Sequence, residues 1–231
     1  MKNNSEKVSV IMSVRNGENT VIKAAESILN QTYKDLEFLI IDDSSEDNTF
    51  SEIKKLEVMD SRVKVFQNKE NLGLTRSLNR LIKITEGKYI ARQDADDYSH
   101  IDRISTQVKY LNEKNLDAIT SRANVIGSKS KIPGLSFYIP YKIAAKFKNP
   151  FIHGTLLIRK RVLQDMGFYD ENFYFAQDYK LFLDLLRNDC KIKNLNKILY
   201  YLNIENNISS IYKKEQKYYS DCAKKGIVPS E

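Results

Sequence analysis

The chain has 231 residues, of which 42% are hydrophobic and 29% are charged, and its formal net charge is +7. These values suit one soluble globular domain with at most a small appendage. No stretch approaches 18 consecutive apolar residues, so no bilayer-spanning helix is expected.

Strand and helix patterns alternate through the first hundred residues. Short apolar runs predict buried strands at 8–14, 37–41, 63–66 and 88–92. Apolar residues at helical spacing predict a helix over 21–29 with Asn19 as its N-cap, and another over 74–82 that ends at Gly87. The alternation predicts an α/β domain with a mostly parallel sheet.

Right-handed crossovers would place the carboxyl ends of these strands along one edge of the sheet, where ligands bind in open α/β folds. The loops expected there are 13–19, 42–47, 68–73 and 93–97. They carry Glu18, Asp42, Asp43, Asn71 and the acidic cluster at 94–97. Polar side chains therefore gather where the topology predicts a ligand.

The second half of the chain is less regular. We expect helices at 101–111 and 178–186 and strands at 118–126, 155–158 and 197–202. Between them, residues 129–148 contain Pro133, Gly134 and Pro140 and are predicted to form a mobile loop. No internal repeat and no low-complexity tract occurs.

Three carboxylates, Asp94, Asp96 and Asp97, occupy four successive positions after the strand at 88–92. Their mutual repulsion is unfavourable unless water screens it or a cation occupies the site. If the strand continues, Asp94 and Asp96 point to the same side. Their oxygens suit Mg²⁺ or Mn²⁺ shared with a nucleotide diphosphate. Alternatively, the cluster is solvated and caps the helix near Ile101.

Other candidate residues have two interpretations each. Asp178 begins a predicted helix, whose positive end would keep it ionised, either as a functional carboxylate or as a simple cap. His153 is structural or contacts a donor or acceptor, and Asn79 caps, packs or binds. His100 is expected at the surface.

Taken together, the motifs resemble the family 2 glycosyltransferases, inverting nucleotide-sugar transferases with the Rossmann-like GT-A fold. The matching segments, in chain order, are 8–18, 27–33, 38–45, 71–79, the Asp-x-Asp motif at 94–96, and 176–179. The resemblance runs from residue 8 to residue 209.

The resemblance implies a donor site made of Ser13, Arg15, Glu18, Asp43, Asn71, Gly73, Asp94, Ala95, His153, Gly154 and Thr155. It implies that Asp43 binds the uracil ring, that Asp96 and Asp94 hold Mn²⁺ or Mg²⁺, and that Asp178 is the catalytic base. Arg15 replaces a frequent aromatic residue, and Gln177 replaces a frequent Glu. No histidine lies at 201–209, so no metal ligand is assigned there.

The favoured function is an inverting, metal-dependent glycosyltransferase. It would move a hexose or N-acetylhexosamine from a UDP-sugar to a saccharide, expected to be lipid-linked, in bacterial surface polysaccharide synthesis. One alternative is a nucleotidyltransferase, although residues 15–18 form a poor phosphate loop. Another is a non-catalytic nucleotide-sugar-binding module, against which the intact acidic residues argue.

Residues 1–98 are expected to bind the donor, 99–210 to bind the acceptor and carry the base, and 211–231 to form a basic tail. The tail is either solvated or in peripheral contact with an anionic membrane, and the scattered aromatic residues do not indicate nucleic acid. The segment 1–7 is polar and lacks the apolar core of a signal peptide. Cys190 and Cys222 have no metal-ligand spacing and suggest a reducing compartment, so the cytoplasm is expected. Sugar, acceptor and oligomeric state stay open.

Overall fold

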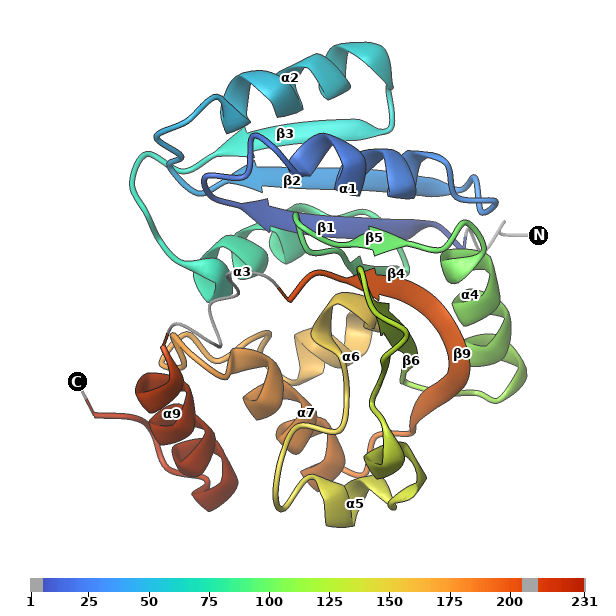
Figure 1. The fold of residues 1–231 in the computed structure, drawn as a ribbon, viewed down its shortest axis with the longest axis vertical. Helices are drawn as coiled ribbons and strands as arrows, with labels where there is room; N and C mark the ends of the chain where they lie inside the picture. The colour runs from blue at the N-terminus through green and yellow to red at the C-terminus, as the bar shows by residue number, and fades with distance from the viewer. Residues whose placement is uncertain (1–5, 205–211, 231) are drawn as a thin grey trace.

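The protein is described by a computed structural model that covers residues 6–204 and 212–230. Within this part, one mixed sheet runs through the molecule in the order β3-β2-β1-β4-β8-β6-β9-β5, with β7 paired to β6 (Figure 1). Its strands are β1 (Val8–Val14), β2 (Leu36–Asp42), β3 (Val63–Gln67), β4 (Tyr89–Arg92), β5 (Tyr98–Ser99), β6 (Ala118–Val125), β7 (Lys131–Ile132), β8 (Leu157–Arg159) and β9 (Ile192–Leu202).

The sheet has a parallel half and a mixed half. Strand β1 pairs in parallel with β2 and β4, and β2 pairs in parallel with β3. Beyond β4, strand β8 runs antiparallel to both β4 and β6, whereas β6 and β9 are parallel with a register shift near Arg122. The expected α/β class is confirmed, and the parallel half places the ends of β1, β2 and β4 at one edge.

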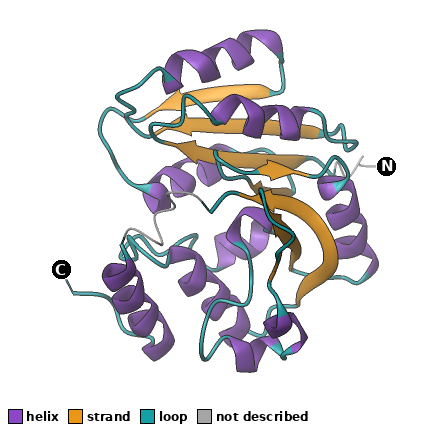
Figure 2. Cartoon of the chain, viewed as in Figure 1, coloured by secondary structure: helices purple, strands orange, loops and turns teal. Residues whose placement is uncertain are grey.

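Helices cover both faces of the sheet (Figure 2). The longer ones are α1 (Val21–Leu29), α2 (Thr49–Met59), α3 (Leu74–Ile84), α4 (Arg103–Glu113), α7 (Gln177–Arg187) and α9 (Lys213–Lys225), and the short ones are η1 (Leu135–Tyr138), α5 (Tyr141–Ala144), η2 (His153–Thr155) and α6 (Lys160–Asp165). Helices α1, α2 and α4 contribute to one buried cluster, and α3, α6 and α7 to another. Alternate residues of β1 join opposite clusters, as the period of two requires: Met12 joins the first and Ile11 the second.

Several local expectations are corrected by the structure. Helix α1 has Thr20, and not Asn19, as its N-cap residue, and α3 has Thr85 at its C-cap, before Gly87. The proposed loop at 129–148 contains β7, η1 and α5. Helices α2 and α6 were not expected, because α2 buries few apolar side chains and α6 is short.

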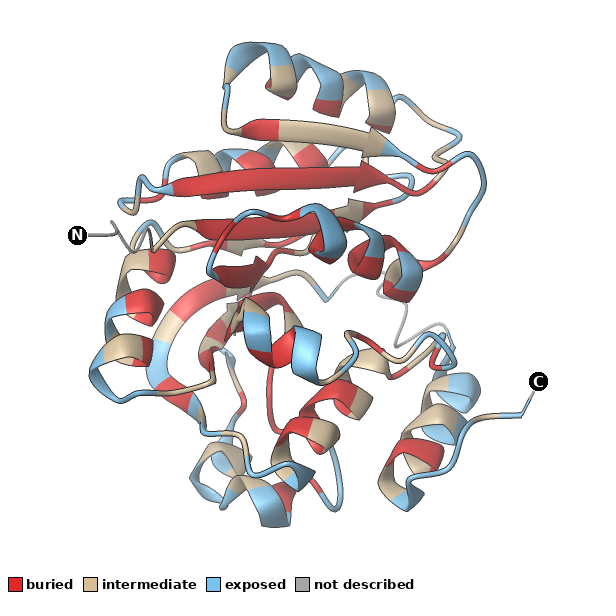
Figure 3. Ribbon diagram, turned by 180° about the vertical axis from the view of Figure 1, so that it is seen from behind, coloured by how far each residue is buried: buried red, intermediate tan, exposed pale blue. Residues whose placement is uncertain are grey.

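The C-terminal helix α9 packs against α7. Cys222 and Ala223 of α9 join a small apolar cluster with Phe173, Tyr179 and Leu183, while the outer side of α9 is exposed (Figure 3). In the residues that the structure covers, no helix is long and apolar enough to span a bilayer. Residues 1–5, 205–211 and 231 lie outside the described residues. They belong to the polar segment 1–7, to the region 201–209 and to the basic tail 211–231.

Candidate active site

Loops meet at the edge where the parallel strands end. The Arg15 guanidinium, in the loop after β1, lies 3.1 Å from the carboxylate of Glu46 in the loop after β2. Glu18 accepts hydrogen bonds from the backbone and side-chain amides of Asn48 at 3.0 and 2.9 Å. Ser13 is half-buried near the end of β1. The structure therefore brings these predicted residues to one edge, as the topology required.

Asp43 follows β2 directly and is buried. Its carboxylate accepts hydrogen bonds from the Gly73 amide at 2.8 Å and from the Asn68 side chain at 2.6 Å. The exposed Asn71 also accepts a bond from the Gly73 amide, at 3.0 Å. Gly73 has a φ of 80°, which favours glycine. Asp43, Asn71 and Gly73 thus form one unit that joins the end of β2 to the start of α3.

The acidic cluster lies in a turn and not on a strand. Strand β4 ends at Arg92, and Asp94, Ala95 and Asp96 follow in the connection to β5. The expectation that strand alternation orients the two aspartates is therefore wrong, because the strand has already ended. The cluster does not cap the next helix either, since the N-cap residue of α4 is Asp102.

Two buried arginines lie behind this turn. Arg92 makes an ion pair with Asp94 at 2.6 Å. Arg103 donates hydrogen bonds to the Arg92 carbonyl at 2.9 Å and the Gly154 carbonyl at 2.6 Å, and its guanidinium lies 5.4 Å from the centroid of the Tyr200 ring. The Tyr200 hydroxyl in turn accepts a bond from the Asp94 amide at 3.1 Å. These contacts fix the turn from its buried side.

The carboxylates in the turn repel one another. Burial, followed by the charge of Asp94, raises the pKa of Asp96, while Arg92 lowers it. Burial and the charges of Asp94 and Asp96 raise the pKa of Asp97 to about 8. Asp97 is buried and accepts a hydrogen bond from the Asn203 amide at 2.6 Å. The turn therefore brings together carboxyl groups whose ionised forms are disfavoured by burial and by one another.

This donor set fits a hard divalent cation that is shared with a phosphate. No group of three His, Cys, Asp or Glu side chains that could hold a metal occurs among residues 6–204 and 212–230. Two carboxylates are nevertheless enough for Mg²⁺ or Mn²⁺ when substrate phosphate and water complete the coordination. Burial and the charge of Asp94 disfavour the ionised form of Asp96, and a bound cation would favour it.

Gly154 allows the chain to pass close to the acidic turn. A Cβ at this position would lie 2.4 Å from the Tyr200 hydroxyl and 2.6 Å from Oδ2 of Asp94. Thr155 is fully buried, and its hydroxyl accepts a bond from the Ser121 amide at 3.1 Å. Of this predicted pair, Gly154 thus borders the turn, whereas the side chain of Thr155 contacts protein.

His153 contacts Tyr169 beside the same turn. Its Nε2 lies 2.7 Å from the Tyr169 hydroxyl. Burial, followed by the charge of Arg92, lowers the pKa of His153 to about 3. The imidazole is therefore neutral at physiological pH, and it acts as a hydrogen-bonding group and not as a cation.

Asp178 lies in the first turn of α7, after Ala176, which has a φ of 52°. The Asn149 side chain donates a hydrogen bond to Asp178 Oδ2 at 2.8 Å. Burial raises the pKa of Asp178, and the charge of Asp94 raises it further, whereas the Tyr179 amide and Asn149 lower it. The helix start thus favours the ionised form, as expected, but burial outweighs it. One short segment reaches both carboxylates, because Asn149 bonds Asp178 and Gly154 lies against Asp94.

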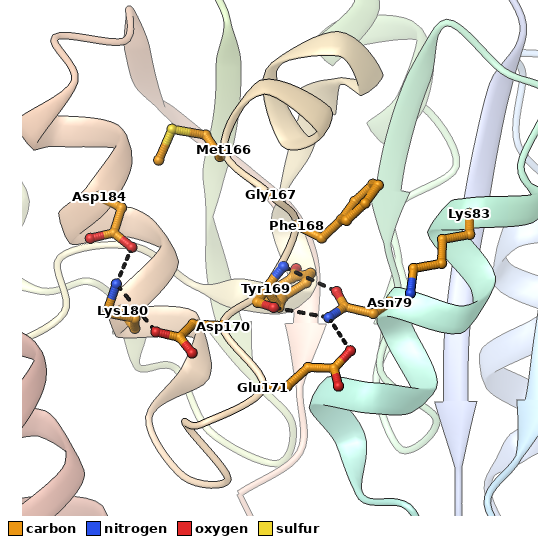
Figure 4. Close-up of a pocket in the computed structure, with 10 residues that line it drawn as sticks. All are labelled: Asn79, Lys83, Met166, Gly167, Phe168, Tyr169, Asp170, Glu171, Lys180 and Asp184. Atoms are coloured by element: carbon orange, nitrogen blue, oxygen red, sulfur yellow. Dashed lines mark hydrogen bonds and ion pairs between the residues drawn. The ribbon is translucent and has the colours of Figure 1, made fainter. Parts of the chain in front are cut away.

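A cavity of about 430 Å³ lies outside this group, between α3, α7 and the loop after α6 (Figure 4). There Asn79 bonds the backbone of Tyr169 at 2.9 and 3.0 Å and the Glu171 carboxylate at 2.9 Å. Lys180 makes ion pairs with Asp170, in the loop before α7, and with Asp184 of α7. Asn79 is therefore a buried packing residue.

Sequence reasoning missed the supporting residues of the site. Arg92 carried a weak signal, as a charged residue that ends an apolar strand. Arg103, Asn149 and Tyr200 carried none, because they reach the site from α4, from the loop before η2 and from β9. Only the folded chain brings these segments together.

A family model and the similar proteins found by comparison all indicate a glycosyltransferase. The family model described as Glycosyl transferase family 2 matches residues 9–170. A protein of Haemophilus influenzae named uncharacterized glycosyltransferase is 33% identical over 94% of this chain and 71% of its own length. An Escherichia coli protein named UDP-Glc:alpha-D-GlcNAc-diphosphoundecaprenol beta-1,3-glucosyltransferase WfaP is 30% identical over 86% of this chain and 78% of its own length.

The fold is also that of solved GT-A structures. The mannosyltransferase PcManGT from Pyrobaculum calidifontis, solved in complex with GDP-Man and Mn²⁺, superposes with a TM-score of 0.77 at 16% identity. The match covers 97% of this chain and 65% of that protein, so the chain spans less than two thirds of its length. At this identity the likeness establishes the fold alone.

Proposed function

The chain belongs to glycosyl transferase family 2, and we propose that it is an inverting, metal-dependent enzyme that transfers a hexose or N-acetylhexosamine from a UDP-sugar to a lipid-linked saccharide. The name of the Escherichia coli relative supports a UDP-sugar donor and a diphosphoundecaprenol-linked acceptor. The carrying observation is that one short segment contacts both carboxylates, since Asn149 donates a hydrogen bond to Asp178 and Gly154 lies against Asp94. We infer from this that the donor and the base lie in one site. We also propose that the reaction belongs to the synthesis of a bacterial surface polysaccharide.

The nucleotide would bind at the loops after β1 and β2. Asp43 is fixed by the Gly73 amide, and a fixed carboxylate is suited to accept a hydrogen bond from the uracil N–H. Arg15 is exposed at the same edge, where its planar guanidinium can stack on a base. Ser13, Glu18 and the 71–73 segment would complete this part of the pocket.

Asp96 and Asp94 would hold Mn²⁺ or Mg²⁺ beside the diphosphate. When bound, the cation would offset the negative charge that develops on the leaving diphosphate. The ion pair between Arg92 and Asp94 orients one of the two carboxylates from the buried side. The approach of Gly154 leaves the turn no room for another side chain on that side.

Asp178 would act as the general base. It takes the proton of an acceptor hydroxyl as the hydroxyl oxygen forms a bond to the anomeric carbon of the donor. The bond between that carbon and the phosphate oxygen breaks, and UDP leaves with the electron pair. Attack opposite the leaving group inverts the configuration. A raised pKa suits the residue to this task, because a base is most effective with a pKa near the working pH.

The proposal is tested with UDP-Glc, UDP-Gal, UDP-GlcNAc and UDP-GalNAc, and with GDP-Man as a contrast. Release of UDP by hydrolysis, with water as the acceptor of the sugar, is measured with Mn²⁺ or Mg²⁺ and with excess chelator. We expect one UDP-sugar to be turned over only with the cation, and to raise the melting temperature by mass action. Turnover that is unchanged by chelator would contradict the metal assignment.

Asp178→Asn separates the roles of the residues. Loss of the base should lower transfer by about 10²–10⁴-fold while the affinity for UDP stays within about twofold of the wild type. Asp165→Asn, on the exposed side of α6, is the matched control and should leave transfer unchanged. Equal loss of transfer and UDP binding in Asp178→Asn would place the residue in the donor pocket. Binding without turnover by the wild type would indicate a non-catalytic module.

A further inference from the structure

Residues 129–148 form an unusual part of the surface, named here the lysine-rich segment. It contains five lysines and no Asp or Glu. The same segment exposes large apolar side chains, with Leu135 at 89% and Phe147 at 76% exposure. The other large apolar residues exposed here are Tyr138, Ile139 and Ile143. Exposed apolar residues that cluster with charge of one sign mark interaction surfaces.

Helix α5 and the turn after it organise part of this surface. Ala144 and Ala145 are buried and fix the segment to the body of the protein. Ile143 and Phe147 are four residues apart and both exposed, and the amide of Lys148 donates to the Ala144 carbonyl at 3.1 Å, the bond pattern of an α-helix. Helical geometry in this turn therefore places the two apolar side chains on one side. Lys146 and Lys148 flank them and are also exposed.

The lysine-rich segment leads directly to the proposed base. Asn149 follows Lys148 in the chain, and its side chain donates the 2.8 Å hydrogen bond to Asp178. Ala145 belongs to the apolar cluster that also contains Tyr179, next to Asp178. Figure 1 shows α5 at the lower edge of the molecule, below α7. A partner bound to the lysine-rich segment would therefore lie close to Asp178.

We propose that the lysine-rich segment docks on an anionic lipid bilayer, with Ile143 and Phe147 in the headgroup region and the lysines against acidic headgroups. Apolar side chains supply buried area, and lysines supply attraction to the negative surface potential. This inference rests on the proposed function, because a lipid-linked acceptor must be reached from the membrane surface. Docking here presents Asp178 to the acceptor as it leaves the bilayer.

The C-terminal helix α9, in the basic tail that could either be solvated or contact a membrane, is a weaker candidate. Its Lys217 and Lys224 both make ion pairs with Asp221, at 2.9 and 2.7 Å. Its buried Cys222 and Ala223 face α7 and so cannot enter a bilayer. The lysine-rich segment contains no acidic residue, and within 6–204 and 212–230 its one ion pair joins Lys142 to Asp189.

The test is flotation of the full chain with vesicles of phosphatidylcholine alone and of phosphatidylcholine mixed with phosphatidylglycerol. We expect binding only to the mixed vesicles, and weaker binding at high salt, since salt screens the attraction. Ile143→Ser combined with Phe147→Ser should lower the bound fraction by about tenfold. Lys146→Gln combined with Lys148→Gln should lower it as well.

Two matched controls keep the test specific. Val58→Ser combined with Met59→Ser removes apolar residues of 88% and 80% exposure at the end of α2 and should leave binding unchanged. Lys109→Gln combined with Lys114→Gln removes two exposed lysines of α4 and its C-cap, with the same expectation. No binding to the mixed vesicles, or equal loss in the controls, overturns the inference. Binding of single-stranded RNA in place of vesicles would overturn it in favour of nucleic acid.

Failure of this inference can be told apart from failure of the proposed function. Binding of UDP with Mn²⁺ is measured in solution for the same variants, without vesicles. If UDP binds but the vesicles do not, only the docking surface is refuted. If the vesicles bind but no nucleotide or UDP-sugar does, the docking surface stands and the proposed function is refuted.

Discussion

At Asp178, burial and hydrogen bonding act in opposite directions on the pKa of the carboxyl group. Burial is the larger effect and raises the pKa, whereas the bonds from Asn149 and from the Tyr179 amide lower it. A base must be ionised to accept a proton. The bond from Asn149 therefore favours the ionised form of Asp178, and in the proposed mechanism this residue would position and tune the base.

Asn149→Ala removes that bond, so the pKa of Asp178 should rise further. Hydrogen bonds to charged groups contribute about 1.5–3 kcal/mol, which corresponds to about one pKa unit or more. The acidic limb of the kcat/KM profile should then move to higher pH by at least about one unit, with rates converging at high pH. The measurement is the pH dependence of transfer. Asn172→Ala, at an exposed position before α7, should leave the limb in place. An unshifted limb in Asn149→Ala would show that the bond does not control the base.

The aspartates and glycines of the site could be identified from sequence motifs. The residues that surround them in the folded protein could not be predicted. Asp94, Asp96 and Asp178 stand in recognisable motifs. The raised pKa of Asp178, however, depends on burial and on a charge that lies distant in sequence. Neither can be read from the residues beside it.

At the scale of elements, the acidic turn depends on a close approach of η2. The backbone at Gly154 passes Asp94 and Tyr200 at a distance that no side chain can fill. The Gly154 carbonyl also accepts the 2.6 Å hydrogen bond from the buried Arg103 of α4. Elements η2, α4, β4 and β9 therefore hold the turn jointly.

Gly154→Ala should disturb this arrangement. The added Cβ would lie 2.4 Å from the Tyr200 hydroxyl and 2.6 Å from Asp94, so both side chains must move. We expect metal-dependent UDP binding to weaken by about tenfold or more, since overpacking typically costs about 1–3 kcal/mol. Isothermal titration with UDP and Mn²⁺ measures the change.

Gly134→Ala is the control for that substitution. Its Cβ would lie 3.8 Å from the nearest atom, the Lys131 carbonyl oxygen, which is ordinary contact. Binding of UDP should therefore be unchanged in Gly134→Ala. If Gly154→Ala also binds UDP with wild-type affinity, the close approach has no part in holding the acidic turn.

Elements with strong apolar periodicity were predictable, and weakly amphipathic ones were not. The predicted strand at 8–14 matches β1, and the helix at 178–186 lies within α7. Helix α2 buries only Thr49, Ile53 and Leu56 and exposes Val58 and Met59, so its pattern is faint. Burial against β2 and β3, and not local periodicity, stabilises such a helix.

For the whole molecule, α9 packs against α7, the helix that contains Asp178. Arg187 at the end of α7 donates to the carbonyls of Ala223 and Lys224 at 2.8 and 2.9 Å. The ring of Phe173, just before α7, lies 6.1 Å from that of Tyr219 in α9. The C-terminal helix is therefore part of the fold that supports Asp178.

A chain that ends at residue 204 should lose stability and transfer activity together. Removal of α9 exposes Phe173, Tyr179 and Leu183 to water, and burial of each such side chain contributes about 1.5–3 kcal/mol. Thermal unfolding and UDP release measure the two effects. A chain that ends at Val228 keeps α9 and should behave as the full chain does. A stable, fully active chain without α9 would show that α7 does not depend on it.

The sequence by itself determined the α/β class, the parallel strands of the first half and the motifs that indicate the family. Those features depend on local periodicity and on residue types at fixed spacing, which are properties of the chain before it folds. The positions of Asp43 directly after a strand and of Asp178 at a helix start could likewise be predicted from the local pattern.

Only the tertiary structure decided how these residues meet. The turn that carries Asp94 is held by Tyr200, which lies 106 residues away in sequence, and Asp178 by Asn149, 29 residues away. The mixed order β4-β8-β6-β9 brings those segments together. Burial and electrostatic interactions depend on distance in space and not on distance along the chain, so the raised pKa values and the location of the lysine-rich segment beside Asp178 appear only once the chain has folded.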